Sequence, residues 1–313
     1  MEIHQLRYVL AIADQGNFTR AAEVVHVAQP SLSQQVSKLE EELGHKLFHR
    51  LGRRAVPTEA GTAFIERARR ILLEVENATK EIMDDPSLGR RITIGAVPTL
   101  APYLLPPLID RSRTAYPNIE IFTLEAFRSE LVEAVLNGDL DFALVSLPLR
   151  DARLSIEPIF SEPLLLAVGK HHPFAKKPEV HASDLAEETF VMMGVGSTLA
   201  TQVQRFCGDH DFEPRIGYRC AQIATLKAFV SHGLGIAILP QTARHIADKK
   251  GLVYRELSGR APRREIALIR HLQRFQSRGA EQVIRLVRDE LGATRERPDT
   301  PGPASVLVPS ETN

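Results

Sequence analysis

The apolar residues of this 313-residue chain change their spacing near Arg91. Before that point they recur every three or four residues, and after it short apolar runs alternate with helical stretches. Because a pattern of helical period cannot be satisfied on a strand, the two parts must fold differently. We therefore predict an all-α N-terminal part and an α/β C-terminal part, and the length of the chain also suggests two or three domains.

Three short helices are predicted at the start of the chain. Gly16 ends the first, Thr19 is expected to cap the second, and Pro30 opens a third that runs to about Leu43 and is ended by Gly44. Two helices that are separated by a tight turn predict a helix-turn-helix unit. The apolar face of the first helix is formed by Leu6, Val9, Leu10 and Ala13.

The third of these helices has a polar face opposite its apolar stripe. Hydroxyl and amide groups both donate and accept hydrogen bonds, as the reading of base edges in a major groove requires. The following segment 45–54 carries four fixed positive charges and no acid, and we expect a wing whose arginines hold phosphates. A solvated surface face is the alternative interpretation. The residues predicted to contact DNA are Thr19, Arg20, Gln29, Pro30, Ser31, Ser33, Gln34, Lys38, Arg50, Arg53, Arg54 and Thr58.

A long helix is predicted from about Thr58 to Met83. Its apolar residues are spaced alternately by four and three, and this period is typical of a two-stranded coiled coil. We expect the helix to join two protomers, so that two DNA-binding units reach half-sites about one helical turn apart. Packing within one chain is the alternative. The stripe consists of Phe64, Ala68, Ile71, Val75, Ala78 and Ile82.

Strands and helices alternate from residue 91 to about residue 292. Over 92–146 the order is strand, helix, strand, helix, strand, which indicates a parallel sheet with helices on its faces. Two lobes fit into this part, with a ligand expected at the carboxyl ends of their strands. The proline-rich stretch 293–313 is predicted to be a disordered tail. Later strands are predicted at 164–168, 189–192, 235–239 and 265–270, and later helices at 198–206 and 280–291.

Composition excludes several classes of protein. Hydrophobic residues make up 43% and charged residues 25%, as in soluble globular proteins, and Lys plus Arg equals Asp plus Glu at 39 each. No apolar run approaches the roughly 18 to 20 residues of a membrane span, and no signal peptide is recognisable. Two cysteines do not make a disulfide framework. We therefore expect a cytoplasmic protein with no membrane partner.

The motifs speak against catalysis. The sequence shows no phosphate-binding glycine-rich loop, no nucleophile elbow and no clustered acid–base set, so we predict no catalytic residue and no cofactor. His171 and His172 have no further His or Cys at metal-ligand spacing nearby, so no metal site is predicted. The alternative of another class is a two-lobed metabolic enzyme or solute-binding protein, because fold does not fix function.

Specific motifs occur in both the N-terminal and the C-terminal part of the chain. They are the run Gln29–Gln35, the pattern Leu47-Phe48-x-Arg50, the pattern Thr58-x-x-Gly61 and the segment 233–240. In these motifs the chain resembles the LysR-type transcriptional regulators, and the resemblance extends to about residue 292.

This resemblance implies a winged helix-turn-helix domain over 1–58, a dimerising linker helix over 59–88 and a two-lobed effector domain of the periplasmic-binding-protein type over 91–292. Its lobes would be 91–162 with 267–292, and 163–266. The resemblance also implies double-stranded promoter DNA and a small effector as partners, a homodimer or homotetramer, and RNA polymerase as the partner of an activator. The location would be the bacterial cytoplasm, at the nucleoid when bound to DNA.

Within that family the effector domain most resembles the peroxide-sensing OxyR branch, through the segment 95–106. That branch uses a reactive cysteine beside a histidine and a resolving cysteine nine residues later. Here Cys207 fits the resolving position, but Ser197 and Thr198 stand at the histidine and reactive-cysteine positions. Since a hydroxyl cannot form a sulfenic acid, we predict that peroxide is not the direct signal. A thiol-based regulator that uses Cys207 and Cys220 is the alternative, and two buried structural thiols are the expected state.

Two predicted helix starts, at Thr99 and at Ser197-Thr198, indicate an anionic effector, because free N–H groups and the helix dipole favour negative charge. Plain capping of each helix is the alternative. Arg128 is a candidate to pair with an acidic ligand. The residues predicted to bind the effector are Thr99, Leu100, Arg128, Ser146, Ser197, Thr198 and Gln202.

Overall fold

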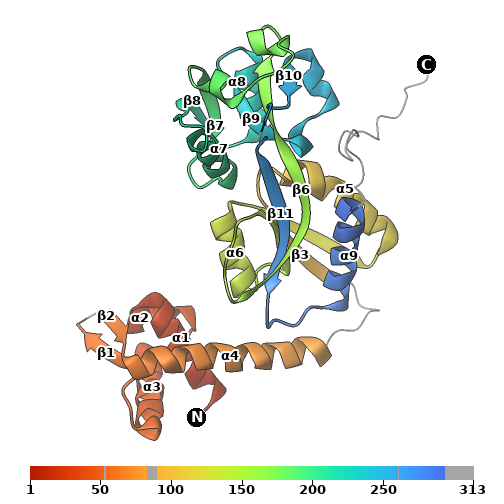
Figure 1. The fold of residues 1–313 in the computed structure, drawn as a ribbon. Coiled ribbons are helices and arrows are strands. Elements are labelled where there is room, and N and C mark those ends of the chain that lie inside the picture. Colours follow the sequence, from red (N-terminus) through yellow and green to blue (C-terminus); the bar gives the residue numbers. More distant parts are fainter. Residues whose placement is uncertain (53, 83–89, 260, 293–313) are drawn as a thin grey trace. The chain divides into compact units, whose positions relative to one another are not determined.

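The computed structural model describes residues 1–52, 54–82, 90–259 and 261–292 (Figure 1). Arg53, the last predicted residues of the linker helix and the predicted tail 293–313 lie outside the described residues. The chain forms two compact units, Met1–Asp85 with Gln273–Phe275, and Pro86–Leu272 with Gln276–Asn313.

The first unit is built around the three predicted helices. Their buried faces meet in one core, which includes Val9, Ile12, Leu32, Val36 and Leu39. Gly16 and Gly44 end the first and third helices in the left-handed conformation, as predicted. The elements are α1 (Ile3–Gln15), α2 (Phe18–Val24), α3 (Gln29–Leu43), β1 (Phe48–Leu51), β2 (Arg54–Pro57) and α4 (Glu59–Ile82).

The cap of α2 differs from the prediction. Asn17, and not Thr19, is the capping residue, and its side chain accepts hydrogen bonds from the backbone N–H of Thr19 at 2.8 Å and of Arg20 at 3.1 Å. Because Asn17 directly follows the left-handed Gly16, the helix starts two residues earlier than the threonine would have placed it. Thr19 therefore lies inside the first turn of α2 and is exposed.

The predicted stripe of α4 divides into two halves. Ala68 is completely buried and Phe64 packs against the core of the first unit, so this half serves packing within one chain. Ile71 is 41% and Ile82 87% exposed, and Val75 between them is half-buried, so the second half is less covered within the part of the chain that is described. The coiled-coil prediction therefore rests on the second half alone.

The second unit begins with the predicted βαβαβ unit. Its sheet has the strand order β10-β6-β11-β5-β3-β4, with β3 parallel to both β4 and β5. In a parallel arrangement the carboxyl ends of these three strands lie on the same edge of the sheet. The elements are β3 (Arg90–Ala96), α5 (Ala101–Ala115), β4 (Ile119–Glu125), α6 (Arg128–Asn137) and β5 (Phe142–Ser146).

Two long strands run through both parts of the second unit. β6 (Leu154–Gly169) pairs with β11 (Arg263–His271) along Leu154–Pro163 and then with β9 (Ala237–Pro240) and β10 (Leu252–Arg255). Figure 1 shows β6 (light green) and β11 (blue) side by side through both parts. One core, which we call that of lobe I, contains residues 92–160 and 266–291, and the other, that of lobe II, contains residues 164–257.

The second unit contains elements that the sequence pattern did not reveal. The first half of β6, the edge strand β8 (Arg215–Cys220), α8 (Ile223–Ser231) and β10 were not predicted. β8 pairs on one side only, with β7, and its residues are mostly exposed, so it lacks the apolar alternation of a half-buried strand. The later predicted elements appear as β7 (Thr189–Met193), α7 (Thr198–Gly208) and β9 in lobe II, and as β11 and α9 (Arg278–Gly292), whose buried residues 266–291 belong to the core of lobe I.

Candidate DNA interface and effector site

The polar face of α3 is exposed as predicted. Leu32, Val36 and Leu39 are completely buried, whereas Gln34 and Lys38 on the other side are exposed and Ser33 is half-buried. The start of α2, the start of α3 and the wing together line an open hollow. Its lining residues are Asn17, Phe18, Thr19, Arg20, Glu23, Gln29, Arg50, Gly52 and Arg54.

Strands β1 and β2 form the predicted wing. Arg50 lies in β1, and its guanidinium is 4.5 Å from the centre of the Phe18 ring, while its Nη2 donates a hydrogen bond to Ser37 Oγ at 3.3 Å. The cation is thus held against α2 and α3 by a cation–π contact and one hydrogen bond. Arg54 lies opposite Leu51 in the hairpin and is exposed. Two of the three predicted phosphate-binding arginines therefore reach the surface of the hollow.

Gln34 and its neighbour Gln35 have different surroundings. Gln35 Oε1 lies 3.4 Å from Nε2 of His4, and the buried Gln5 donates to the backbone oxygen and to Oε1 of Gln35 at 3.4 and 3.3 Å. Gln35 is therefore attached to α1. Gln34, with its exposed amide, is the better placed of the two to contact a base.

Thr58 has an internal role. Its hydroxyl donates to the backbone oxygen of Lys46 at 2.6 Å and accepts from the N–H of Gly61 at 2.9 Å. A Cβ atom at Gly61 would lie 1.9 Å from the backbone oxygen of Leu47, so only glycine allows this approach. The Thr58-x-x-Gly61 pattern thus joins α4 to the start of the wing, and a DNA contact by Thr58 stays a prediction.

The predicted effector residues of lobe I lie at the carboxyl ends of its parallel strands. Thr99 and Leu100 follow β3, Arg128 follows β4, and Ser146 ends β5. One detail differs from the prediction: α5 begins at Ala101 with Leu100 as its cap residue, so Thr99 lies before the helix. Thr99 and Leu100 are 4% and 1% exposed, and the N–H of Leu100 donates to the backbone oxygen of Val97.

Thr99 is engaged by an arginine that the sequence analysis missed. Arg264 is 1% exposed, and its Nη1 donates to Thr99 Oγ1 at 2.7 Å. Its Nε donates to Glu162 Oε1 at 2.8 Å, and its Nη2 lies 3.3 Å from Thr242 Oγ1. The sequence contains a signal for its burial, because Arg264 lies two and four residues before the buried Ile266 and Leu268, and alternate residues of a strand lie on the same face.

Arg128 and Gln202 bind three successive carbonyl groups. Arg128 Nη1 donates to the backbone oxygens of Ser146 at 3.1 Å and Pro148 at 2.7 Å, and Gln202 Nε2 donates to that of Leu147 at 3.0 Å. These contacts bring together α6, the end of β5 and α7, as the prediction requires. The Oε1 atom of Gln202 is buried and has no hydrogen-bond partner among the described residues.

The start of α7 agrees with the prediction. Ser197, 4% exposed, is the cap residue and Thr198 the first helical residue, and the Ser197 side chain makes no capping hydrogen bond. Phe127, the cap residue of α6, makes none either. The two helix starts are close, because a Cβ atom at Gly196 would lie 3.7 Å from the Phe127 ring. Two helix N-termini without side-chain caps and one arginine form a site suited to an anion.

A second polar cluster was also missed. Lys227 of α8 donates to Asp248 Oδ2 at 2.7 Å, Tyr254 donates to the same oxygen at 2.7 Å, and the Lys227 ammonium is 5.5 Å from the centre of the Tyr103 ring. Burial raises the pKa of Tyr103 to about 12. Burial alone would raise the pKa of Asp248, but the hydrogen bonds from Lys227 and Tyr254 bring it below its ordinary value.

Both cysteines are buried in lobe II and free. Burial raises the pKa of Cys207 to about 12 and also raises that of Cys220. Both groups are therefore neutral thiols at neutral pH, whereas the thiolate is the form that reacts with peroxide. Within the described ranges no cluster of three or more His, Cys, Asp or Glu side chains is arranged to hold a metal ion.

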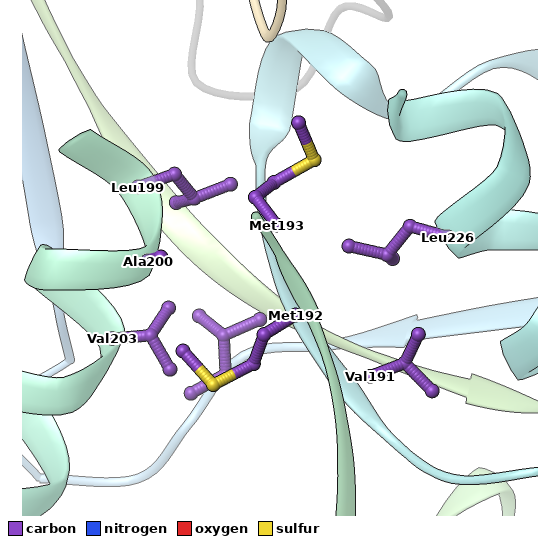
Figure 2. Close-up of a pocket in the computed structure, with 8 residues that line it drawn as sticks. Val191, Met192, Met193, Leu199, Ala200, Val203 and Leu226 are labelled. Atoms are coloured by element: carbon purple, nitrogen blue, oxygen red, sulfur yellow. The ribbon is translucent and has the colours of Figure 1, made fainter. Parts of the chain in front are cut away.

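A small cavity lies beneath α7. Figure 2 shows Leu199, Ala200 and Val203 of α7 on one side, and Met192 and Met193 of β7 beside them. Its volume is about 10 Å³, which is room for about one water molecule. The cavity is therefore too small and too apolar to be the effector site.

No helix in the described ranges combines the length and the apolar character that crossing a bilayer requires.

Comparison with known proteins identifies both parts of the chain. Residues 3–62 match the family model of bacterial regulatory helix-turn-helix proteins of the lysR family, and residues 86–292 match the LysR substrate binding domain. A hydrogen peroxide-inducible genes activator of Dickeya chrysanthemi is 36% identical over 86% of this chain and 89% of its own length. The Hca operon transcriptional activator HcaR of Escherichia coli is 30% identical over 94% of this chain and 99% of its own length.

Solved structures agree with these relatives. A full-length OxyR variant from Pseudomonas aeruginosa covers 92% of this chain and 99% of its own, with 26% identity and a TM-score of 0.58. A full-length BenM variant covers 94% and 97%, with 27% identity and a TM-score of 0.57. Regulators of this family bind promoter DNA and small-molecule effectors and form oligomers, and they are not enzymes. The chain belongs to the LysR family of DNA-binding transcriptional regulators.

Proposed function

We propose that this regulator reads promoter DNA through the exposed face of α3, with Arg50, Arg53 and Arg54 on phosphates. The observation that supports it is the hollow that Thr19, Arg20, Gln29, Arg50 and Arg54 line together. Two protomers pair through the exposed half of α4, in a homodimer or homotetramer. The protein acts in the bacterial cytoplasm, at the nucleoid when bound to DNA, and an activating form contacts RNA polymerase.

We further propose that a small anionic effector binds where the starts of α6 and α7 meet the end of β5, and that it alters promoter binding or activation. The single observation that carries this is Arg128 beside two helix N-termini without side-chain caps. The buried Oε1 of Gln202 indicates that the effector, or a water molecule beside it, also donates a hydrogen bond. The hydroxyl of Thr99 is held by Arg264, so Thr99 supports the site rather than forming it.

Peroxide is not the direct signal in this proposal, although several relatives are named hydrogen peroxide-inducible activators. The argument combines two observations. Thr198 begins α7 at the position where the OxyR branch has its reactive cysteine, and Cys207 is completely buried as a neutral thiol. The oxidation therefore lacks both an exposed nucleophile and its thiolate form.

A thermal-shift screen of the full chain tests the effector site. The probes are acetate, succinate, citrate, benzoate and inorganic phosphate, since an anion that binds only the folded state raises the unfolding temperature. We expect at least one to stabilise the parent and an Arg150→Gln control, but not Arg128→Gln, because Arg150 is exposed and outside the site. Equal stabilisation of the Arg128 variant would place the anion elsewhere.

A further inference from the structure

The recognition helix α3 carries one carboxylate that faces inward. Glu40 is 4% exposed, whereas its neighbours Glu41 and Glu42 are exposed. A buried carboxylate is stable only where hydrogen bonds or opposite charges replace the lost water. Since this side chain cannot reach DNA from the core, its partners inside the unit define its role.

Both oxygens of Glu40 are used at the base of the wing. Oε1 accepts hydrogen bonds from the backbone N–H of Leu47 at 2.9 Å and of Phe48 at 3.3 Å, and Oε2 accepts from Lys46 Nζ at 2.8 Å. The Lys46 side chain is 68% exposed, so water screens this ion pair. The two bonds to buried backbone N–H groups are therefore the part that fixes geometry.

The same short segment is also bonded to Thr58, the residue directly before α4. The hydroxyl of Thr58 donates to the backbone oxygen of Lys46, and the N–H of Thr58 donates to that of Leu47 at 2.9 Å. The N–H groups of residues 47 and 48 are thus hydrogen-bonded to Glu40 of α3. The carbonyl groups of residues 46 and 47 are hydrogen-bonded to Thr58, at the start of α4. The wing begins directly after this point, because Phe48 is the first residue of β1.

We propose that Glu40 is a positioning residue for DNA binding, which sets the direction of the wing relative to α3. The hairpin has four residues in each strand, so a change in direction at Phe48 displaces Arg50 and Arg54 from the phosphates. Glu40 sets this direction from α3, the helix that also carries Gln34. This inference rests on the proposed phosphate contacts of Arg50 and Arg54.

Salt dependence of DNA binding tests the proposal, because each phosphate contact contributes about 0.9 to the slope of log K against log salt. The full chain is titrated with a random-sequence duplex of about 30 base pairs, which requires no knowledge of the operator. We expect Glu40→Ala to lower the slope by about 2, and to weaken binding about tenfold at low salt. Glu41→Ala removes the same charge from an exposed neighbouring position and should keep the parental slope.

A purely structural role predicts a different result. It lowers the unfolding temperature and the fraction of active protein, but the active fraction, counted by titration at saturating DNA, keeps the parental slope. That outcome would overturn the proposal. If Glu40→Ala does not fold, Glu40→Gln is the variant to measure. It keeps one acceptor oxygen for Leu47 and should show a salt slope between those of the parent and of a variant without the acceptor. A parental slope in Glu40→Gln would again overturn the proposal.

Arg54→Ala separates this inference from the proposed interface. If the phosphate contact of Arg54 is correct, the variant loses about 1 from the slope. A parental slope in Arg54→Ala together with a reduced slope in Glu40→Ala contradicts the contact of Arg54 but retains the positioning role. A reduced slope in Arg54→Ala together with a parental slope in Glu40→Ala retains the interface and overturns the positioning role of Glu40.

Discussion

The DNA-binding unit and the effector domain place their candidate binding residues differently. On α3 and the wing, Gln34, Lys38 and Arg54 are exposed. In the effector domain, Thr99, Ser146 and Ser197 are buried, and Thr99 and Arg128 are already bonded to protein groups. Side chains that contact a large partner such as DNA lie on a surface that is exposed to water before binding. Side chains that contact a small molecule line an enclosed site.

This difference indicates that substitutions in the two parts have different consequences. We expect replacement of an exposed residue such as Gln34, Lys38 or Arg54 to affect DNA contacts alone, whereas Arg50 also contacts Phe18 and Ser37. A residue of the effector site is replaced at the expense of the lobe that it also holds together.

Replacing Arg264 with Met should destabilise the effector domain by about 3–5 kcal/mol, because the buried carboxylate of Glu162 loses its only ion-pair partner among the described residues and keeps only its hydrogen bonds from Thr242. Urea unfolding of the full chain followed by circular dichroism measures the loss. The adjacent, exposed Arg263→Met is the matched control and should change stability by less than about 0.5 kcal/mol. A loss below about 1 kcal/mol for Arg264→Met would contradict the importance of this buried pair.

Placing Glu at both Ile71 and Val75 should raise the dimer dissociation constant at least about a hundredfold, or about 2.8 kcal/mol, because two carboxylates would be buried in the seam. Sedimentation equilibrium of the full chain measures it. Lys80→Glu changes the charge of the same helix by the same amount outside the stripe and should leave the constant unchanged. A double variant that stays as dimeric as this control excludes the seam.

Gln34→Ala should reduce discrimination at one base position by about 1–3 kcal/mol, whereas Arg54→Ala should weaken binding to all sequences equally. Selection from a random duplex library, followed by affinity measurements on single-base variants of the selected site, separates the two effects. Lys38→Ala, on the same exposed face of α3, shows whether any substitution there relaxes the preference. Equal loss of specificity in the glutamine and arginine variants would contradict the division between base and phosphate contacts.

Stoichiometric peroxide should leave both cysteines reduced and DNA binding unchanged. The pKa of Cys207 is raised to about 12, so the folded protein keeps the proton through neutral pH and up to pH 9, and only the unfolded chain ionises near its ordinary value of 9. Alkylation by iodoacetamide at pH 8 should therefore be fast only in urea. A rapid Cys207–Cys220 bridge, detected by mass spectrometry, that alters DNA binding in the parent but not in a Cys207→Ser/Cys220→Ser variant would favour the thiol-based alternative.

Local patterns were sufficient for the DNA-binding unit and for the first half of the effector domain. Helical periodicity located α1, α3 and α4, and short apolar runs located β3, β4 and β5, because each signal lies within a few residues. The network of Arg264 could not be derived in this way. Its partners Glu162, Thr99 and Thr242 come from distant segments, so only the fold brings them together.

The same limit applies to single side chains. The sequence analysis assigned no role to Glu40, and its burial depends on the turn at Leu47 that Thr58 holds in place. Thr19 was predicted as a cap because Ser, Thr, Asp and Asn share that preference, and Asn17 was the nearer candidate after Gly16. Burial and competition between neighbouring residues are properties of the packed structure.

The pairing of β6 with β11 determines when each part of the chain is able to fold during synthesis. Glu162 and Arg264 are 102 residues apart, and the core of lobe I needs residues 266–291. During synthesis α1–α4 and the core of lobe II are therefore complete before β11, the strand that pairs with β5 and completes the sheet of lobe I, has been synthesised. At about 5–20 residues per second the delay between β5 and β11 lasts on the order of 5–20 s, and we expect the apolar surface of β3, β4 and β5 to require chaperone protection during that interval.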